Sequence, residues 1–337
     1  MPTPYPLGKL PPDVLAAVLT PFAPRDPRVI LGPRPGEDAA VLDLGDRYLV
    51  AKTDPITFAT DQIGWYAVHV NANDIATTGA TPAWFMATLL LPDGSTDRAL
   101  VERIFQQIGE ACDELGISLV GGHTEITHAL ARPVVVGVML GLVSKERLIT
   151  TGGAQPGDAL LVTKGVPVEG TAIIAREKAD LLRSRFSSAF LARCSNFLHD
   201  PGIGVTRDAA LATGAGRVHA MHDPTEGGLA VGLWEMAEVA GKRLAVDCSA
   251  VVLEEGRALC EAAGLDPLGV IASGALLMAV HPADLSVIKA TLEQDGIRVY
   301  HIGHVEAGPP AVIDRSSGEQ TPLPRPTRDE ITKLFES

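Results

Sequence analysis

The chain has 337 residues, a length that predicts two domains or one large one, and 46% of them are apolar, enough for well-packed cores. With 28 basic and 41 acidic side chains the net charge is −13, which argues against a nucleic-acid surface because such surfaces gather Lys and Arg against phosphates. The apolar runs are too short to span a membrane, and residues 1–10 lack the pattern of a signal peptide. The four cysteines show no C-x-x-C spacing, so we expect a reduced, cytoplasmic setting.

Hydrophobic periodicity and turn residues outline the first half of the chain. Residues 1–20 are proline-rich and are expected to wrap a surface. The elements expected next are a strand hairpin at 39–44 and 47–53, helices at 61–78 and 97–115, and strands at 83–91, 117–120 and 133–143. Ser95 or Thr96 is the expected cap of the second helix and Gly116 its stop, and the last two strands are apolar enough to be buried.

Residues 151–157, TGGAQPG, are dense in helix and strand breakers and are the expected domain boundary. The elements expected after it are a strand at 159–163, several helical segments, a helix at 229–240, a strand at 275–281, a helix ending near 295 and a strand at 297–305. The tail 308–326 is expected to be peripheral. Because strands and helices do not alternate strictly, we expect two α+β domains.

Nucleotide sites in many enzymes are marked by a Walker A loop or a G-x-G-x-x-G turn, and this chain has neither. Acidic residues instead stand at breaks between the expected elements: Asp38, Asp54, Asp74 and Glu125. Carboxylates from separate elements can converge on Mg²⁺, which prefers oxygen ligands and shares them with phosphates. The alternative is that these are ordinary turn residues, because Asp and Gly are common in turns, and spacing alone leaves both open.

Several motifs in order resemble the family of aminoimidazole ribonucleotide (AIR) synthetase and the hydrogenase-maturation protein HypE. The matching segments are LGPRPGEDAAV at 31–41, TDPIT at 53–57, IGWYAVHVNANDIATTGATP at 63–82, GGHT at 121–124, GVPVEGTAI at 165–173 and HDPTEGGL at 222–229. The resemblance spans residues 30–305. It implies a PurM-like two-domain fold whose N-terminal sheets pair into a barrel in a homodimer and whose C-terminal domain is an α/β sandwich. The implied domains are 1–152 and 153–325, followed by a tail at 326–337.

The resemblance also implies the site and its chemistry. ATP and Mg²⁺ would lie in a groove between the domains, and the γ-phosphoryl group would pass to an amide or carbonyl oxygen of a small substrate. Asp38, Asp54 and Asp74 would be the metal ligands. The implied nucleotide and groove contacts are Thr53, Asn73, Gly121, Gly122, Thr124, Asp223 and Thr225.

Three departures separate this chain from the HypE pattern. HypE ends in a cysteine that carries a carbamoyl group, whereas this chain ends in Ser337. His123 and Glu125 replace an acid and a lysine, and these two are the candidate catalytic residues because His suits acid–base work. A Glu-Gly pair before a late strand is replaced by Ser273-Gly274, and Glu169 is a candidate to replace the missing acid.

Three functions therefore stay open: an ATP-dependent enzyme acting on an unidentified small molecule, a HypE-like maturation factor that works on a cysteine of a partner protein, and a non-catalytic nucleotide-binding module. A zinc site at the histidine pairs 219/222 and 301/304 is a further alternative, against an ordinary surface role for each. The three tryptophans are expected to be packing residues rather than stacking partners of a ligand.

Overall fold

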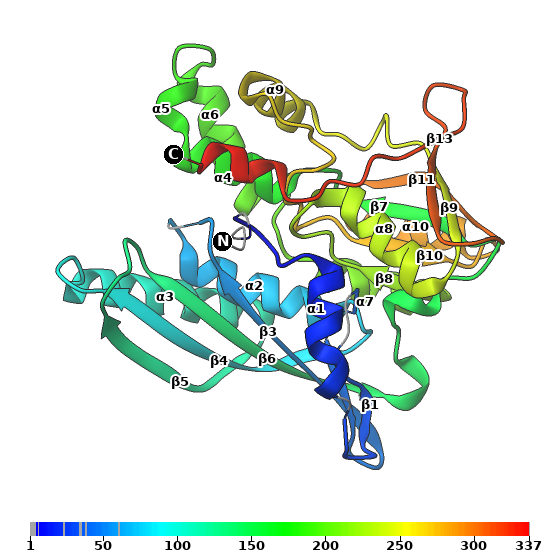
Figure 1. The fold of residues 1–337 in the computed structure, drawn as a ribbon, viewed down its shortest axis with the longest axis horizontal. Coiled ribbons are helices and arrows are strands. Elements are labelled where there is room, and N and C mark those ends of the chain that lie inside the picture. Colours follow the sequence, from blue (N-terminus) through cyan, green and yellow to red (C-terminus); the bar gives the residue numbers. More distant parts are fainter. Residues whose placement is uncertain are drawn as a thin grey trace. The chain divides into compact units, whose positions relative to one another are not determined.

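The computed structural model describes residues 5, 7–22, 24–33, 36–37, 39–59 and 61–336. The chain forms two compact units, each built around one sheet (Figure 1). One unit comprises Asp26–Leu31 and Asp38–Leu148, and the other comprises Met1–Arg25, Gly32–Glu37 and Ile149–Ser337. We call them the first-sheet unit and the second-sheet unit. The predicted domain limits at 152 and 325 stay a prediction, because contact units describe packing rather than independent folding.

The first-sheet unit has a six-stranded sheet in the order β1-β2-β3-β6-β4-β5. Its strands are β1 (Val29–Leu31), β2 (Ala40–Asp43), β3 (Arg47–Ile56), β4 (Thr81–Pro92), β5 (Ser118–Thr127) and β6 (Val134–Ser144). All neighbours are antiparallel except β4 and β5, which are parallel and are joined through a helix, as parallel strands require.

Two helices lie on one side of this sheet, α2 (Ile63–Ala76) and α3 (Arg98–Leu115) (Figure 1). Helix α2 is buried on nearly every side and includes the polar residues Asn71, Asn73 and Asp74. Helix α3 is amphipathic and ends at Gly116, as predicted. Its cap is Asp97, whose carboxylate accepts the Leu100 N–H at 2.7 Å, and not Ser95 or Thr96.

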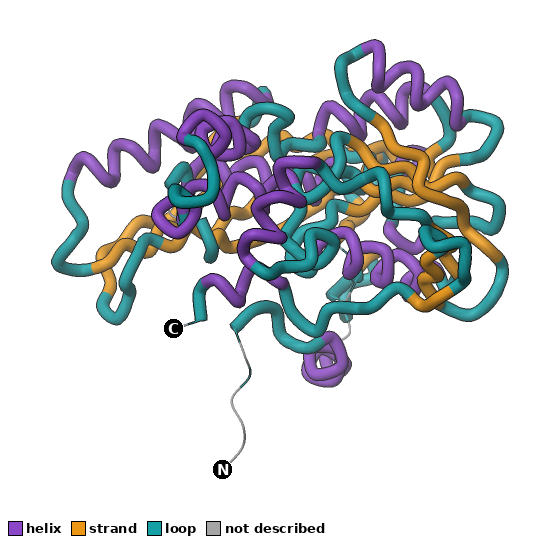
Figure 2. The backbone as a smooth tube through the Cα atoms, turned by 90° about the horizontal axis from the view of Figure 1, so that it is seen from above, coloured by secondary structure: helices purple, strands orange, loops and turns teal. Residues whose placement is uncertain are grey.

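The second-sheet unit has a seven-stranded sheet in the order β13-β12-β9-β11-β7-β10-β8, with helices on its faces (Figures 1 and 2). Its strands are β7 (Ala159–Thr163), β8 (Val218–His222), β9 (Arg243–Val246), β10 (Leu277–Val280), β11 (Val299–Glu306), β12 (Ala311–Asp314) and β13 (Thr321–Pro322). Its longer helices are α1 (Pro12–Leu19), α4 (Val168–Glu177), α6 (Ser188–Ser195), α7 (Thr206–Ala215), α8 (Gly228–Ala240), α9 (Glu254–Ala263) and α10 (Leu285–Gln294). The short helical turns of this unit are α5 (Ala179–Leu182), η1 (Thr20–Phe22), η3 (Thr151–Gly153), η4 (Asn196–Leu198) and η5 (Glu330–Leu334). The turn η2 (Lys145–Arg147) lies in the first-sheet unit.

The predicted α+β class is confirmed, and two expectations about individual segments are wrong. The strand expected at 117–120 is longer and is exposed along almost its whole length, because β5 is an edge strand rather than a buried one. The tail expected to be peripheral adds β12 and β13 to the second sheet, where Val312 is fully buried. In the described part of the chain no helix is long and apolar enough to cross a membrane.

Candidate functional site

Two of the three predicted metal ligands meet at one cationic side chain in the first-sheet unit. The Lys52 Nζ atom lies 3.5 Å from Asp54 Oδ2 and 3.3 Å from Asp74 Oδ2. Asp74 is 2% exposed, so its charge is almost fully removed from water and depends on a nearby cation. The third predicted ligand, Asp38, lies outside the described residues.

The alternation of β3 and the burial of α2 bring these groups together. Lys52 and Asp54 are two residues apart on β3, so their side chains share one face of the strand. Asn71 of α2 accepts the Asp54 N–H at 2.9 Å and donates to the Asp54 carbonyl at 3.2 Å, which locks this part of the strand against the helix. One turn further along α2, Asp74 faces the same place, while Asn73 is fully buried.

This donor set fits a hard divalent cation. Carboxylate oxygens are the ligands that Mg²⁺ prefers, and Mg²⁺ commonly uses one or two of them together with phosphate oxygens and water. Among the described residues no group of three or more His, Cys, Asp and Glu side chains could hold a metal by itself. Asp54 and Asp74 would therefore share the ion with phosphate oxygens, and Lys52 would neutralise further phosphate charge.

The predicted glycines Gly121 and Gly122 lie on β5, at the same height along the sheet as Asp54 but three strands away from it. Asp54 on β3 pairs with Gly137 on β6, Gly137 with Ala87 on β4, and Ala87 with Gly122 on β5. Three strand spacings amount to about 14 Å, so Gly122 cannot touch the same phosphate oxygen as Asp54 within one chain. The backbone of β5 approaches β4 closely there: Gly122 has φ +148°, and a Cβ atom would lie 2.0 Å from the Ala87 carbonyl oxygen.

The candidate catalytic residues His123 and Glu125 contact each other, with His123 Nε2 3.1 Å from Glu125 Oε2, and both are exposed. They lie one and three positions beyond Gly122, so they point to the other face of the sheet from Asp54. Within one chain they do not join the Lys52–Asp54–Asp74 cluster. Of the other predicted contacts, Thr53 donates to the Gly137 carbonyl at 2.8 Å, and Gly121 and Thr124 are exposed on β5.

Asp223 and Thr225 lie in the second-sheet unit, in the turn between β8 and α8. Asp223 is 1% exposed, and the Thr225 hydroxyl accepts a hydrogen bond from Lys9 Nζ at 3.0 Å. Asp329, near the end of the chain, accepts the Gly227 N–H at 2.6 Å and so lies at the start of α8. Burial raises the pKa of Asp329 to about 6.

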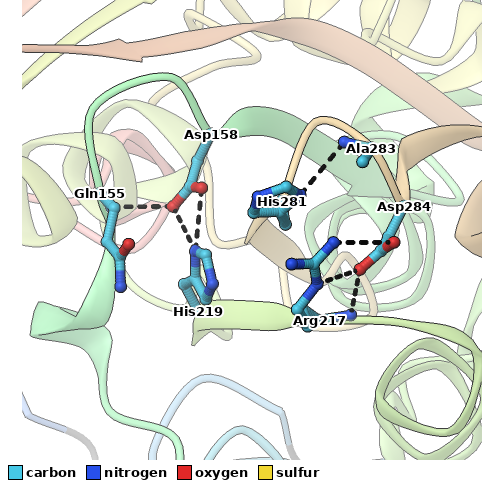
Figure 3. A network of polar contacts seen from close by, with 7 residues as sticks. All are labelled: Gln155, Asp158, Arg217, His219, His281, Ala283 and Asp284. Atoms are coloured by element: carbon cyan, nitrogen blue, oxygen red, sulfur yellow. Dashed lines mark hydrogen bonds and ion pairs between the residues drawn. The ribbon is translucent and has the colours of Figure 1, made fainter.

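The four histidines considered for zinc each have another partner. His219 Nδ1 lies 2.9 Å from Asp158 Oδ1, beside an Arg217–Asp284 ion pair (Figure 3). His222 Nε2 lies 3.0 Å from Glu235, and His301 and His304 contact the Gly303 carbonyl and Glu306 respectively. In each case a ring nitrogen of the histidine is engaged by a carboxylate or a carbonyl group, which favours the structural role over a zinc pair.

The comparisons with known proteins agree with the motifs. Two family models match, described as AIR synthase related protein, N-terminal domain, over residues 36–143, and AIR synthase related protein, C-terminal domain, over residues 155–315. The chain belongs to the AIR synthase related protein family. The predicted membership of the superfamily of AIR synthetase and HypE is therefore confirmed, and with it the prediction of an enzyme family whose members use ATP.

This AIR synthase related protein is similar to relatives of different activities. It is 30% identical over 312 residues to a carbamoyl dehydratase HypE of Cupriavidus necator, covering 86% of each chain. It is 29% identical over 323 residues to a selenide, water dikinase of Nitratidesulfovibrio vulgaris, covering 84% of this chain and 87% of the relative. A crystal structure of hydrogenase maturation protein HypE in complex with ATP matches with a TM-score of 0.70 and 26% identity, covering 91% of this chain and 92% of that one.

Sequence reasoning missed Lys52 and Asn71, which complete the acidic cluster, and Asp329, which lies at the start of α8. A signal existed for Lys52, because its position two residues before Asp54 on a strand places both on one face. None existed for Asp329, which reaches Gly227 across 102 residues of chain.

Proposed function

We propose that this protein is an ATP- and Mg²⁺-dependent enzyme that transfers the γ-phosphoryl group of ATP to an amide or carbonyl oxygen of a small substrate. The observation that carries the proposal is the meeting of the Asp54 and Asp74 carboxylates beside Lys52. Two carboxylates and an ammonium group suit a phosphate-bound metal, because phosphoryl transfer depends on positioning and charge neutralisation. The similarity to a HypE that binds ATP supports ATP as the nucleotide.

Phosphorylation would turn the substrate oxygen into a leaving group. The relatives include a dehydratase of a carbamoyl group and a dikinase of selenide, so the shared step is activation by ATP, and the substrate differs among members. For this chain we infer an amide or carbonyl substrate from its similarity to several carbamoyl dehydratases HypE.

We further propose that the protein works as a homodimer whose first sheets pair through β5. This strand is exposed along nearly its whole length, and its apolar side chains Leu119, Val120 and Ile126 are 43%, 53% and 63% exposed. An exposed apolar edge strand is unfavourable for a lone chain and favours pairing with another copy. Pairing through β5 would also bring His123 and Glu125 of one copy close to the second copy.

A second candidate function is HypE-like maturation of a thiol on a partner protein, and the cysteines favour it over reaction on this chain. All four are buried, and burial raises the pKa of the Cys112 thiol to about 11 and of the Cys194, Cys248 and Cys260 thiols to about 12. A thiol protonated at neutral pH is a poor nucleophile, so the carbamoyl group would have to arrive on another protein.

The test combines binding and turnover. Calorimetry with Mg²⁺ and a non-hydrolysable ATP analogue should show at least about tenfold weaker binding for Asp54→Asn and Asp74→Asn, because each removes one charged ligand. The matched control is Asp43→Asn, whose carboxylate is also paired with a lysine, Lys145, in the same unit. Unchanged affinity in both site variants would refute the metal assignment.

Turnover is measured as phosphate release from MgATP with a panel of primary amides and with a peptide carrying S-carbamoylcysteine. Release with a free amide supports the small-molecule enzyme, and release only with the peptide supports the maturation factor. ATP binding without release under any condition would leave the non-catalytic module as the function.

A further inference from the structure

The ammonium group of Lys52 lies where a metal ion held by Asp54 and Asp74 would have to lie. The Lys52 Nζ atom is 3.5 Å from Asp54 Oδ2 and 3.3 Å from Asp74 Oδ2, within ion-pair distance of both. Mg²⁺ bound by the same two oxygen atoms would also lie between them, at about 2.0–2.1 Å from each. The ammonium group and the metal ion therefore compete for one position in the first-sheet unit.

Of these three side chains, that of Lys52 is the one able to move away. Asp74 is 2% exposed and belongs to the buried helix α2, and the backbone of Asp54 is held by two hydrogen bonds to the Asn71 amide. The Lys52 side chain is 19% exposed, and it carries its charge at the end of a flexible four-carbon stem. The ammonium group can therefore leave the carboxylates while the carboxylates stay in place.

A free metal ion gains less from this site than the two carboxylates alone would offer. Together with Lys52 the two carboxylates carry a net charge of −1. An entering divalent ion meets the ammonium group as a like charge, and this repulsion is stronger in a partly buried place than in water. A metal–nucleotide complex brings phosphate oxygens with it, and these accept the displaced ammonium group in a charge-assisted hydrogen bond.

We propose that Lys52 makes the site select a metal–nucleotide complex over the free metal ion. Its ammonium group holds the position of the metal until phosphate arrives and then pairs with the phosphate. This regulation rests on the proposed function, in which Asp54 and Asp74 hold the metal of MgATP. Its measurable consequence is a positive coupling between metal and nucleotide on the protein, to which Lys52 contributes.

The alternative is an ion pair that only stabilises the fold. Both accounts predict that Lys52→Gln is less stable than wild type in the absence of metal, because the buried Asp74 carboxylate loses a cation. They differ in the affinity for a free metal ion. A purely structural role predicts that this affinity stays the same or falls in Lys52→Gln, whereas selection by Lys52 predicts that it rises.

The first measurement is the binding of free Mn²⁺, a spectroscopic substitute for Mg²⁺, to the full chain by electron paramagnetic resonance. We expect Lys52→Gln to bind free Mn²⁺ at least about tenfold more tightly than wild type. Lys52→Arg keeps the positive charge and should stay close to wild type. The matched control is Lys145→Gln in the same unit, which removes an ammonium group 2.6 Å from Asp43 Oδ2 and should also stay close to wild type.

The second measurement is calorimetry with the Mn²⁺ complex of a non-hydrolysable ATP analogue. Lys52→Gln should bind this complex at least about fivefold more weakly than wild type, because the phosphate loses a charged partner. The two expected changes have opposite signs, and partial unfolding of the variant cannot produce both. Mg²⁺ alone should also raise the Tm of Lys52→Gln by more than it raises that of wild type.

The outcomes separate this regulation from the function beneath it. A wild type that binds the metal–nucleotide complex, together with a Lys52→Gln variant whose affinity for free Mn²⁺ is unchanged or lower, would overturn the inference alone. An equal gain of Mn²⁺ affinity in Lys52→Arg would do the same, because the charge would then not be the cause. Absence of binding of the complex to wild type would overturn the proposed function and the inference with it.

Discussion

Replacing Glu169 by Gln should give a variant whose stability relative to wild type increases as the pH rises. The amide has the same shape as the carboxyl group and carries no charge at any pH. In wild type burial raises the pKa of Glu169 from 4.5 to about 8, so the folded state must hold a proton that the unfolded chain has already lost. The stability from this group is fully present below pH 4.5 and is lost as the pH rises through about 8.

The size of the effect follows from the shift. Each pKa unit corresponds to about 1.4 kcal/mol, so the full cost of ionising Glu169 is about 5 kcal/mol. Between about pH 5.5 and about pH 7.5 the advantage of Glu169→Gln over wild type should grow by about 3 kcal/mol. This is a large part of the 5 to 15 kcal/mol, roughly, that holds an ordinary domain folded.

The assay is urea denaturation followed by tryptophan fluorescence. Trp234 lies in the second-sheet unit together with Glu169, while Trp65 and Trp84 lie in the other unit. A background with Trp65→Phe and Trp84→Phe therefore reports on the unit that matters, which is useful because two units need not unfold together. Glu177→Gln in the same background is the control for removing a glutamate from helix α4. A difference between Glu169→Gln and wild type that does not change with pH would refute the account of its ionisation.

Three further outcomes are expected. Gly122→Ala should destabilise the first-sheet unit in thermal denaturation, because the added Cβ atom would clash with the Ala87 carbonyl oxygen. The control is Gly109→Ala on helix α3, where the added Cβ atom has no neighbour within 4 Å. This control should be neutral or stabilising by up to about 1 kcal/mol. Val120→Lys and Ile126→Lys should shift the protein from dimer to monomer in light scattering, and a monomeric wild type at micromolar concentration would contradict the pairing through β5. Mass spectrometry after incubation with ATP and a carbamoyl donor system should find no adduct that dehydrates on this chain, since its four thiols are buried and protonated.

Local signals in the sequence were sufficient for elements stabilised by their own residues. The helix at 97–115 was predicted within a residue because its apolar stripe is regular and Gly116 ends it. The exposure of β5 was not predicted, because the apolar run at 117–120 indicates burial and only the strand order shows that it lies at an edge. The role of the tail was missed for a similar reason: β12 pairs in parallel with β9, a contact between distant segments.

Some features of the candidate site could likewise be predicted from local motifs, and others could not. Asp54 and Asp74 could be predicted because each stands beside a recognisable motif, and the fold brings both to one lysine. The separation of His123 from Asp54 and Asp74 could not be predicted, because it depends on how many strands lie between β3 and β5 in the sheet. The closeness of Glu169 and Ser273 is likewise a property of the packed unit and of no local pattern.

The ammonium group of Lys52 has a consequence for how the protein is made. Two carboxylates with no counter-charge would repel each other in the nascent unit, and folding would have to wait for a divalent ion. With Lys52 between them, this part of the chain can reach its final shape in the absence of metal. Under the proposed function, a chelator should therefore remove activity while leaving the fold intact.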